Sequence, residues 1–270
     1  MNQAVNDQDK SAEKLEQKLS DIKRVILVLS GKGGVGKSTM ASNIAVELAR
    51  DGSQVGLLDI DIHGPSIPSL LGLEGQQVLS NGDDMLPIEY TPNLKVMSIG
   101  FLIREQNDAV IWRGPMKYGV IRQFLSDVEW GYLDYLVVDS PPGTGDEPLS
   151  VGQMLGKKAE AVIVTTPQKI STNDVRKSIS FCRKLNIPIT GLIENMSGAI
   201  CPHCGEVFDL FTTGGGKQLS EDMDVPFLGA IPFDPAVVSA GDTGRPVSLD
   251  NAESAYTGVL QDVVDKIKDS

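Results

Sequence analysis

Residues 31–39 combine four glycines with two lysines, a serine and a threonine. Gly31, four further residues, and then Gly36, Lys37 and Ser38 have the spacing of a phosphate-binding loop. Glycines let backbone N–H groups turn inward around phosphate oxygens, and the N-terminus of a following helix adds its positive dipole end. Lys37 is predicted to reach the β- and γ-phosphates and the Ser38 hydroxyl to ligate Mg²⁺. The predicted nucleotide-binding loop comprises Gly31, Lys32, Gly33, Gly34, Val35, Gly36, Lys37, Ser38 and Thr39.

Acidic residues follow two other apolar runs of the chain. Gln54–Asp59 reads as a strand that ends in Asp59, with Asp61 two residues later, and Tyr135–Asp139 ends in Asp139. In open α/β sheets, ligands bind at such strand ends. One of the acids Asp59 and Asp61 could hold the Mg²⁺ shell while the other orients water, and Asp139 is predicted to hold Mg²⁺ through water. The alternative for Asp59 and Asp61 is that they cap a neighbouring helix, and the alternative for Asp139 is an ordinary junction of strand and loop.

Alternating strands and helices are predicted to position these groups. A buried strand, Val25–Leu29, precedes the loop, and an amphipathic helix runs from about Lys37 to Arg50. Residues 72–92 are rich in Gly, Asp, Asn and Pro and indicate a long loop or hairpin. Later strands are predicted at Leu94–Ile99, Ala161–Thr165, Ile189–Ile193 and Phe227–Ile231, and later helices from about Thr172 to Leu185 and from about Ala252 to Lys268. This alternation predicts an α/β fold with a mostly parallel sheet covered by helices on both faces.

One domain is predicted for most of the 270 residues. Residues 21–270 form this domain, and residues 1–20 form a flexible N-terminal segment. From Ala12 to Ile22 the helical spacing of Leu15, Leu19 and Ile22 indicates a short lead-in helix. A further helix is predicted to open at Trp112–Pro115, and its apolar stripe is either core or a dimer face.

A second site is indicated between Asn195 and Gly216, where strand and helix patterns lapse. A Cys-x-x-Cys pair, Cys201 and Cys204, lies there in an expected hairpin near residues 196–216. It could be a dithiol redox pair, half of a zinc site or half of a [4Fe–4S] site. Both metal hypotheses need about four ligands, and Cys182 belongs to an apolar helical face. A second copy of the chain would complete the set, with His203 a less favoured substitute ligand.

Composition limits the partners and the compartment. The net charge of −12 argues against nucleic acid as the main partner, because an acidic surface repels phosphates. No signal peptide is recognised, and no apolar run approaches the ~20 residues of a membrane span. Three cysteines are an odd and low count, typical of a reducing cytoplasm. A cytoplasmic protein is therefore expected.

Taken together, the motifs resemble those of the Mrp/ApbC family of phosphate-loop ATPases that carry iron–sulfur clusters, a group related to MinD and the nitrogenase iron protein. The resemblance extends from about residue 21 onward. It rests on the phosphate loop, on Asp59-Ile60-Asp61-Ile62-His63-Gly64-Pro65-Ser66, on Asp139-Ser140-Pro141-Pro142-Gly143-Thr144-Gly145-Asp146, on Asn195-Met196-Ser197 and on Cys201-Pro202-His203-Cys204. The cysteine pair directly after Asn-Met-Ser distinguishes this family from the wider group.

The resemblance implies specific roles at the nucleotide. Lys32 is similar to the signature lysine that crosses a dimer to the partner's nucleotide, and Asp61 to the residue that positions attacking water. With Lys37, these are the expected catalytic residues. Asp139 is similar to the second acid of the Mg²⁺ shell. Asn195, together with Pro232 and Asp234, resembles an adenine site.

The resemblance also implies a function. Cys201 and Cys204 are similar to the ligands of a [4Fe–4S] cluster shared between two subunits. The expected protein is an ATP-hydrolysing homodimer that passes a cluster to apoproteins, and the alternative is a MinD/ParA-like regulatory ATPase with a structural zinc at the dimer interface. No additional four-cysteine motif is present near residue 1, so a second cluster is not expected. The mixed-charge tail from Glu253 disfavours attachment to anionic membranes.

Overall fold

The centre of the fold is a β-sheet that brings the ends of distant strands together. The computed structural model describes residues 13–82, 84–102, 114–201, 203–204, 206–209, 212–250 and 254–270. Within these residues nine strands form one sheet in the order β10-β9-β8-β1-β7-β2-β6-β5, with β11 paired to β9. The strands are β1 Ile22–Ser30, β2 Val55–Asp59, β5 Ile88–Thr91, β6 Leu94–Ser98, β7 Leu133–Asp139, β8 Ala159–Thr165, β9 Ile189–Ile200, β10 Val207–Phe208 and β11 Phe227–Phe233, and a separate hairpin pairs β3 Leu79–Asn81 with β4 Asp84–Leu86.

The central strands are parallel, as the sequence predicts. β1 lies between β7 and β8 and is parallel to both, and its last six residues, 25–30, are buried. β5 and β10 are the antiparallel strands of the main sheet. A strand that is buried on both faces reads as a continuous apolar run, which is why the parallel core was recognisable from sequence. The hairpin of β3 and β4 falls in the segment predicted as a loop or hairpin.

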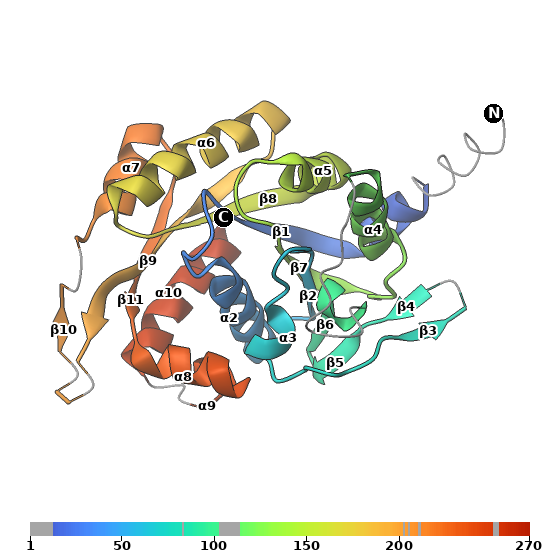
Figure 1. Ribbon diagram of the computed structural model, residues 1–270, viewed down its shortest axis with the longest axis horizontal. Helices are drawn as coiled ribbons and strands as arrows, with labels where there is room; N and C mark the ends of the chain where they lie inside the picture. Colours follow the sequence, from blue (N-terminus) through green and yellow to red (C-terminus); the bar gives the residue numbers. More distant parts are fainter. Residues whose placement is uncertain are drawn as a thin grey trace.

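Helices cover both faces of this sheet (Figure 1). One apolar core contains buried residues of α4, α5, α6 and α7, and the other contains residues of α2, α3, α9 and α10. The described helices are α2 Lys37–Arg50, α3 Ile67–Leu70, α4 Gly114–Ser126, α5 Asp146–Leu155, α6 Lys169–Leu185, α7 Gly215–Met223, α8 Pro235–Thr243, α9 Val247–Asp250 and α10 Ala255–Asp269. Ile121, Phe124 and Leu125 of α4 are buried in the first core, so that part of its apolar stripe is core. Trp112 and Arg113 lie outside the described residues.

The folded chain begins earlier than the predicted boundary at residue 21. Residues 13–20 are helical, and Leu15 and Leu19 are buried against the same core as α4 and α5. Lys18 Nζ lies 3.0 Å from Asp84 Oδ2, which ties this helix to β4. The predicted lead-in helix is thus present over residues 13–20, and its apolar stripe packs on that core. Residues 1–12 lie outside the described residues.

The segment after Asn195 is more regular than its sequence indicates. Strand β9 continues to Ile200, and β10 pairs with its end in antiparallel register, with Val207 opposite Ile200. The expected lapse of strand structure is wrong for 196–200. Met196 has a φ of +56° and Gly198 a φ of +74°, and these residues interrupt the alternation on which strand prediction depends. Helix α7, which begins at Gly215, was also not predicted.

Candidate nucleotide and metal site

The phosphate loop joins β1 to α2 and keeps its backbone accessible. Gly34 and Gly36 have φ values of +81° and +83°, a conformation that a side chain disfavours. A Cβ on Gly31 would lie 2.5 Å from the carbonyl carbon of Asp174, so the loop rests directly on α6. The loop therefore presents its N–H groups at the N-terminus of α2, where an anion is favoured.

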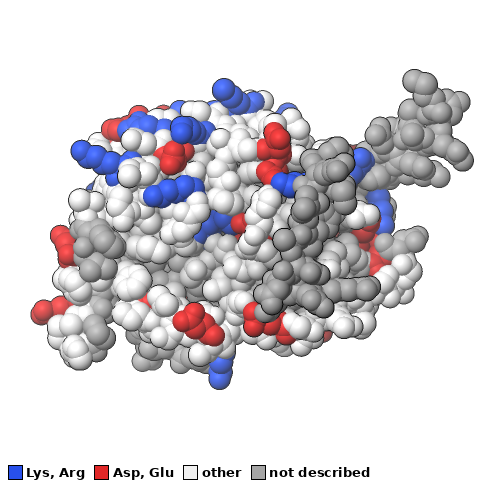
Figure 2. Space-filling view, viewed as in Figure 1, with Lys and Arg blue, Asp and Glu red and all other residues white. Residues whose placement is uncertain are grey.

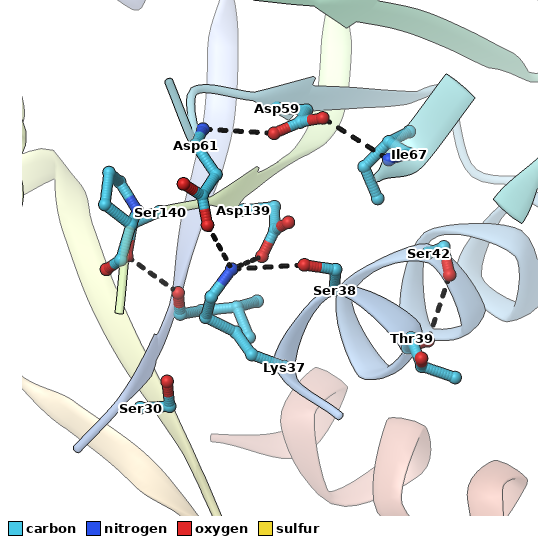
Figure 3. A network of polar contacts seen from close by, with 12 residues as sticks. Ser30, Lys37, Ser38, Thr39, Ser42, Asp59, Asp61, Ile67, Asp139 and Ser140 are labelled. Carbon is cyan, nitrogen blue, oxygen red and sulfur yellow. Dashed lines mark hydrogen bonds and ion pairs between the residues drawn. The ribbon is translucent and has the colours of Figure 1, made fainter. Parts of the chain in front are cut away.

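Lys37 connects the loop with the acids of two strands (Figure 3). Its Nζ contacts Oδ1 of Asp139 at the end of β7, and lies 3.2 Å from Ser38 Oγ and 3.9 Å from Asp61 Oδ2. Lys37 and Asp61 are nearly buried and Asp139 is fully buried. Four of the predicted site residues thus meet in one cluster at the carboxyl ends of parallel strands.

Burial perturbs two carboxylates of this cluster. Removal from water raises the pKa of Asp139, and the neighbouring Lys37 ammonium opposes that rise. Removal from water, together with the charge of Asp139, raises the pKa of Asp59 to about 7. Asp59 accepts hydrogen bonds from the N–H groups of Asp61 and Ile67 and from Ser98, so its main contacts hold the backbone of the β2–α3 connection.

The cluster offers the oxygen ligands that Mg²⁺ prefers. Oδ2 of Asp139 is buried and has no hydrogen-bond partner among the residues that the structure describes, and the Ser38 hydroxyl lies beside Lys37 in the same cluster. A buried carboxylate oxygen without a partner is costly unless a cation or water completes it. The residues present therefore fit the predicted magnesium site.

Lys32 lies apart from these contacts. Its side chain is half-exposed, and it forms no ion pair with the residues that the structure describes. Its carbonyl accepts a hydrogen bond from Ser30 Oγ at 3.0 Å, which shapes the loop backbone.

A cavity of about 320 Å³ adjoins the loop at Gly36 and Thr39. Asn195, Pro232 and Asp234, which the resemblance places at an adenine site, all line it. Asn195 Nδ2 donates to the carbonyl of Val35 at 2.9 Å, and Asp234 caps α8 by accepting from the Ala236 N–H. Further lining residues, which sequence reasoning missed, include Ser66, Met196, Val237, Val238 and Tyr256. The sequence around these residues indicates only core or loop positions. The cavity forms between elements that are distant in sequence, so no local pattern predicts which residues line it.

The cysteine pair lies just beyond the strand that carries Asn195. Cys201 is half-exposed and Cys204 exposed. The Cys201 N–H donates to the Glu206 carbonyl at 2.9 Å. The backbone N–H groups of Cys204 and His203 lower the pKa of the Cys201 thiol, which favours the thiolate that binds metal. Pro202 and Gly205 lie outside the described residues.

One copy of this site is incomplete as a metal site. No group of three or more His, Cys, Asp and Glu side chains suited to a metal ion occurs within the residues that the structure describes. Cys182 is buried in α6, and burial raises the pKa of its thiol to about 12, so it is an inert core residue as predicted. His203 is exposed.

A phosphate loop after β1, with acids after β2 and β7 of a parallel sheet, defines the class of phosphate-loop nucleotide-binding proteins. Among the described helices, none has the length and apolar character needed to cross a bilayer.

The chain belongs to the family described as ParA: NUBPL iron-transfer P-loop NTPase, whose model matches residues 21–268. A cytosolic Fe–S cluster assembly factor NUBP2 homolog from Trichoplax adhaerens is 49% identical over 247 residues, covering 90% of this chain and 93% of that protein. An iron–sulfur cluster carrier protein from Methanocaldococcus jannaschii is 48% identical over 257 residues, covering 94% and 89%.

Solved structures share the fold. A nucleotide-binding protein from Archaeoglobus fulgidus, in complex with ADP and with Co, is 39% identical, with a TM-score of 0.78 over 91% of this chain and 95% of that one. The cell division ATPase MinD from Pyrococcus furiosus has a TM-score of 0.65 at 22% identity, covering 92% and 99%, and shows the fold alone. The predicted fold class and family are therefore confirmed.

Proposed function

We propose that this protein is an ATP-hydrolysing carrier that holds a [4Fe–4S] cluster between two copies of the chain and passes it to apoproteins. The observation that carries the proposal is that one strand, β9, contributes to the nucleotide cavity and leads directly into the cysteine pair. Asn195 lines the cavity beside the phosphate loop, and Cys201 follows directly after the last residue of β9. One strand thus leads from the proposed nucleotide site to the proposed metal-binding thiol pair.

At the nucleotide, Lys37 and Ser38 are the groups that meet the phosphates. When ATP binds, Lys37 leaves Asp139 and contacts the β- and γ-phosphate oxygens, because the triphosphate carries more negative charge than one carboxylate. Asp139 and Ser38 would hold Mg²⁺, which supplies positive charge to the same oxygens. Asp61, which lies 3.9 Å from Lys37, would orient the attacking water.

At the cysteine pair, a cluster is the cargo. Each chain contributes two thiols, and a [4Fe–4S] cluster takes about four thiolates. A two-fold dimer brings the same patch of both copies together and completes the set. Exposure of both thiols makes the cargo accessible to an acceptor protein.

The names of the relatives favour the carrier over the zinc-containing regulatory ATPase, since one is called an iron–sulfur cluster carrier and another a cluster assembly factor. One of them is also called cytosolic. A cytoplasmic protein of reduced thiols accords with the free cysteines of this chain.

Anaerobic purification followed by iron, zinc and acid-labile sulfide analysis tests the proposal. We expect iron and sulfide in equal amounts, with broad visible absorption. Cys201→Ala should lose its iron and sulfide but still bind nucleotide. The matched control Cys182→Ala should retain iron, sulfide and nucleotide binding. Zinc without sulfide would contradict the carrier and favour a structural zinc site. If Cys201→Ala kept the iron and sulfide content of the wild type, the cluster ligands would have to be other residues.

A further inference from the structure

A buried carboxylate lies seven residues before Cys201 in the sequence. Glu194, in β9, is fully buried, and its oxygens accept hydrogen bonds from three donors. These are the Ser197 hydroxyl, the N–H of Gly214 at 2.9 Å and the N–H of Gly216. None of these three donors belongs to the predicted nucleotide site, so the hydrogen bonds of Glu194 do not hold that site directly.

The three donors lie at the two ends of the segment that carries the cysteines. Ser197 precedes Cys201, and Gly214 follows Cys204. We name residues 197–214 the cysteine segment. One side chain therefore joins the start of the cysteine segment to its end.

The pairing of β9 with β11 is irregular at the start of the segment. Asn195 of β9 is opposite Ile231 of β11, but Ala199 is opposite Phe233, so four residues of one strand span two of the other. Met196 and Gly198, with positive φ, account for the extra length. The Glu194–Ser197 hydrogen bond bridges this irregular stretch.

The end of the segment is shaped to receive the carboxylate. Gly214 is the N-cap of α7, with a φ of +79°, and its N–H is one of the helix-terminal donors that need a partner. A Cβ on Gly216 would lie 2.9 Å from Glu194 Oε2, and one on Gly215 would lie 2.2 Å from the Pro167 carbonyl oxygen. Three consecutive glycines thus allow close approach, and the N-terminal end of the helix favours a negative charge.

We propose that Glu194 is a positioning residue that fixes the cysteine segment, and with it Cys201 and Cys204, relative to the nucleotide cavity. The next residue, Asn195, lines that cavity and is bonded to the phosphate loop. Glu194 is hydrogen-bonded to Ser197, Gly214 and Gly216, so it acts on the thiols through the segment that carries them. The consequence for metal binding rests on the proposed function, whereas the consequence for the order of the segment does not.

The test compares Glu194→Gln with the wild-type full-length protein. A glutamine keeps the size of the side chain but replaces one acceptor oxygen with an NH₂ group that faces N–H donors. The matched control is Glu160→Gln, since Glu160 pairs with Arg24 in β1 and contacts no residue of the cysteine segment in the described structure. Hydrogen exchange is measured without metal, and Co²⁺ binding is followed by the thiolate-to-cobalt charge-transfer band.

We expect Glu194→Gln to exchange about tenfold faster across the cysteine segment, with β1 and α2 unchanged, because only local opening becomes easier. Its Co²⁺ affinity should fall about tenfold or more, the size of effect that a residue supporting metal ligands has. Glu160→Gln should show neither change. Should Glu194→Gln fail to fold, Ser197→Ala removes one donor alone, and the expected increase in exchange is smaller and confined to the start of the segment.

Unchanged exchange of the cysteine segment in Glu194→Gln, or an equal increase over the whole protein, would overturn the proposal. Faster local exchange with unaltered Co²⁺ affinity would overturn the positioning of the thiols. If wild-type protein shows no charge-transfer band, the proposed metal site fails, and the exchange comparison still decides whether Glu194 fixes the segment.

Discussion

At the scale of single residues, the nucleotide site places three carboxylates around one ammonium group. Asp59, Asp61 and Asp139 follow the ends of two neighbouring strands, and Lys37 lies 3.9 Å from Asp61 and in contact with Asp139. Removal from water, together with the negative charge of Asp139, raises the pKa of Asp59 to about 7 although the Lys37 ammonium opposes the rise. The site therefore carries excess negative charge above that pH, which favours a bound cation.

The first prediction concerns the titration of Asp59. Its carboxyl resonance should titrate near pH 7 in the folded protein, compared with its ordinary pKa of 3.8. Because the folded state then binds the proton more tightly than the unfolded state, this group lowers the free energy of unfolding as the pH rises from 3.8 towards 7. Denaturant unfolding of Asp59→Asn should show a smaller fall in the free energy of unfolding than wild type between about pH 4 and about pH 7, because the titrating carboxyl is gone. A pKa of Asp59 near its ordinary value of 3.8 in the folded protein would refute this prediction.

The second prediction concerns Lys32. If its ammonium reaches the nucleotide of a second copy, Lys32→Ala should lose about 10³–10⁵ in the rate of ATP hydrolysis, the size of effect of a charge supplied in trans. This corresponds to roughly 4–7 kcal/mol in the activation barrier. ATP binding should persist, because Lys37 and the loop backbone remain. The exposed Lys23 provides the control variant Lys23→Ala, and near-normal phosphate release by Lys32→Ala would exclude the role in trans.

At the scale of elements, the phosphate loop depends on the helix beside it. A Cβ on Gly31 would meet the backbone of Asp174 and Val175 at 2.5 and 2.6 Å, whereas a Cβ on Gly33 would meet no atom within 4 Å. Both glycines belong to the phosphate loop, but their packing differs. The loop is thus supported by α6 at one point and open at another.

The third prediction follows from this difference. Gly31→Ala should lower the free energy of unfolding by about 1–3 kcal/mol, because backbone atoms of α6 must move to admit the methyl group. Gly33→Ala should change it by about 0.5 kcal/mol or less. Chemical denaturation in the absence of nucleotide measures both. Equal stability of the two variants would show that α6 does not support the loop.

At the scale of the whole molecule, the charge is unevenly distributed. Lys and Arg side chains gather over α6 and α7 although the net charge is −12 (Figure 2). Several are paired with acids, as Lys177 is with Asp174 at 3.1 Å and Arg176 with Asp222. Such pairing reduces the attraction of this face for a phosphate polymer. The expected lack of a nucleic-acid partner stays a prediction.

The fourth prediction concerns assembly. Protein reconstituted with iron and sulfide should have the mass of two chains in light scattering, since one chain supplies only Cys201 and Cys204 to the cluster. Cys201→Ala treated in the same way should not be converted to a cluster-bridged dimer. A monomeric, fully loaded protein would contradict cluster sharing, and the nucleotide site would then need another role.

Much of this arrangement could be predicted from sequence because its causes are local. The phosphate loop, the buried strand before it and the helix after it follow from neighbouring residues, and Asp139 is recognisable at the end of an apolar run. The same holds for Cys182, whose helical neighbours are apolar. The roles of Lys32 and Asp61 rest on family resemblance, and they stay predictions.

The sequence by itself determined the alternation of strands and helices, the phosphate loop and the pairing of two thiols, since hydrophobic periodicity and glycine spacing act over a few residues. Only the tertiary structure decided which distant groups meet. It brought Asp234 and Tyr256 to the same cavity as Gly36, and it buried Glu194 against Gly214 and Gly216. The contacts that line this cavity and hold this segment join residues that are far apart in sequence. They depend on how the strands and helices pack together, which no local sequence pattern specifies.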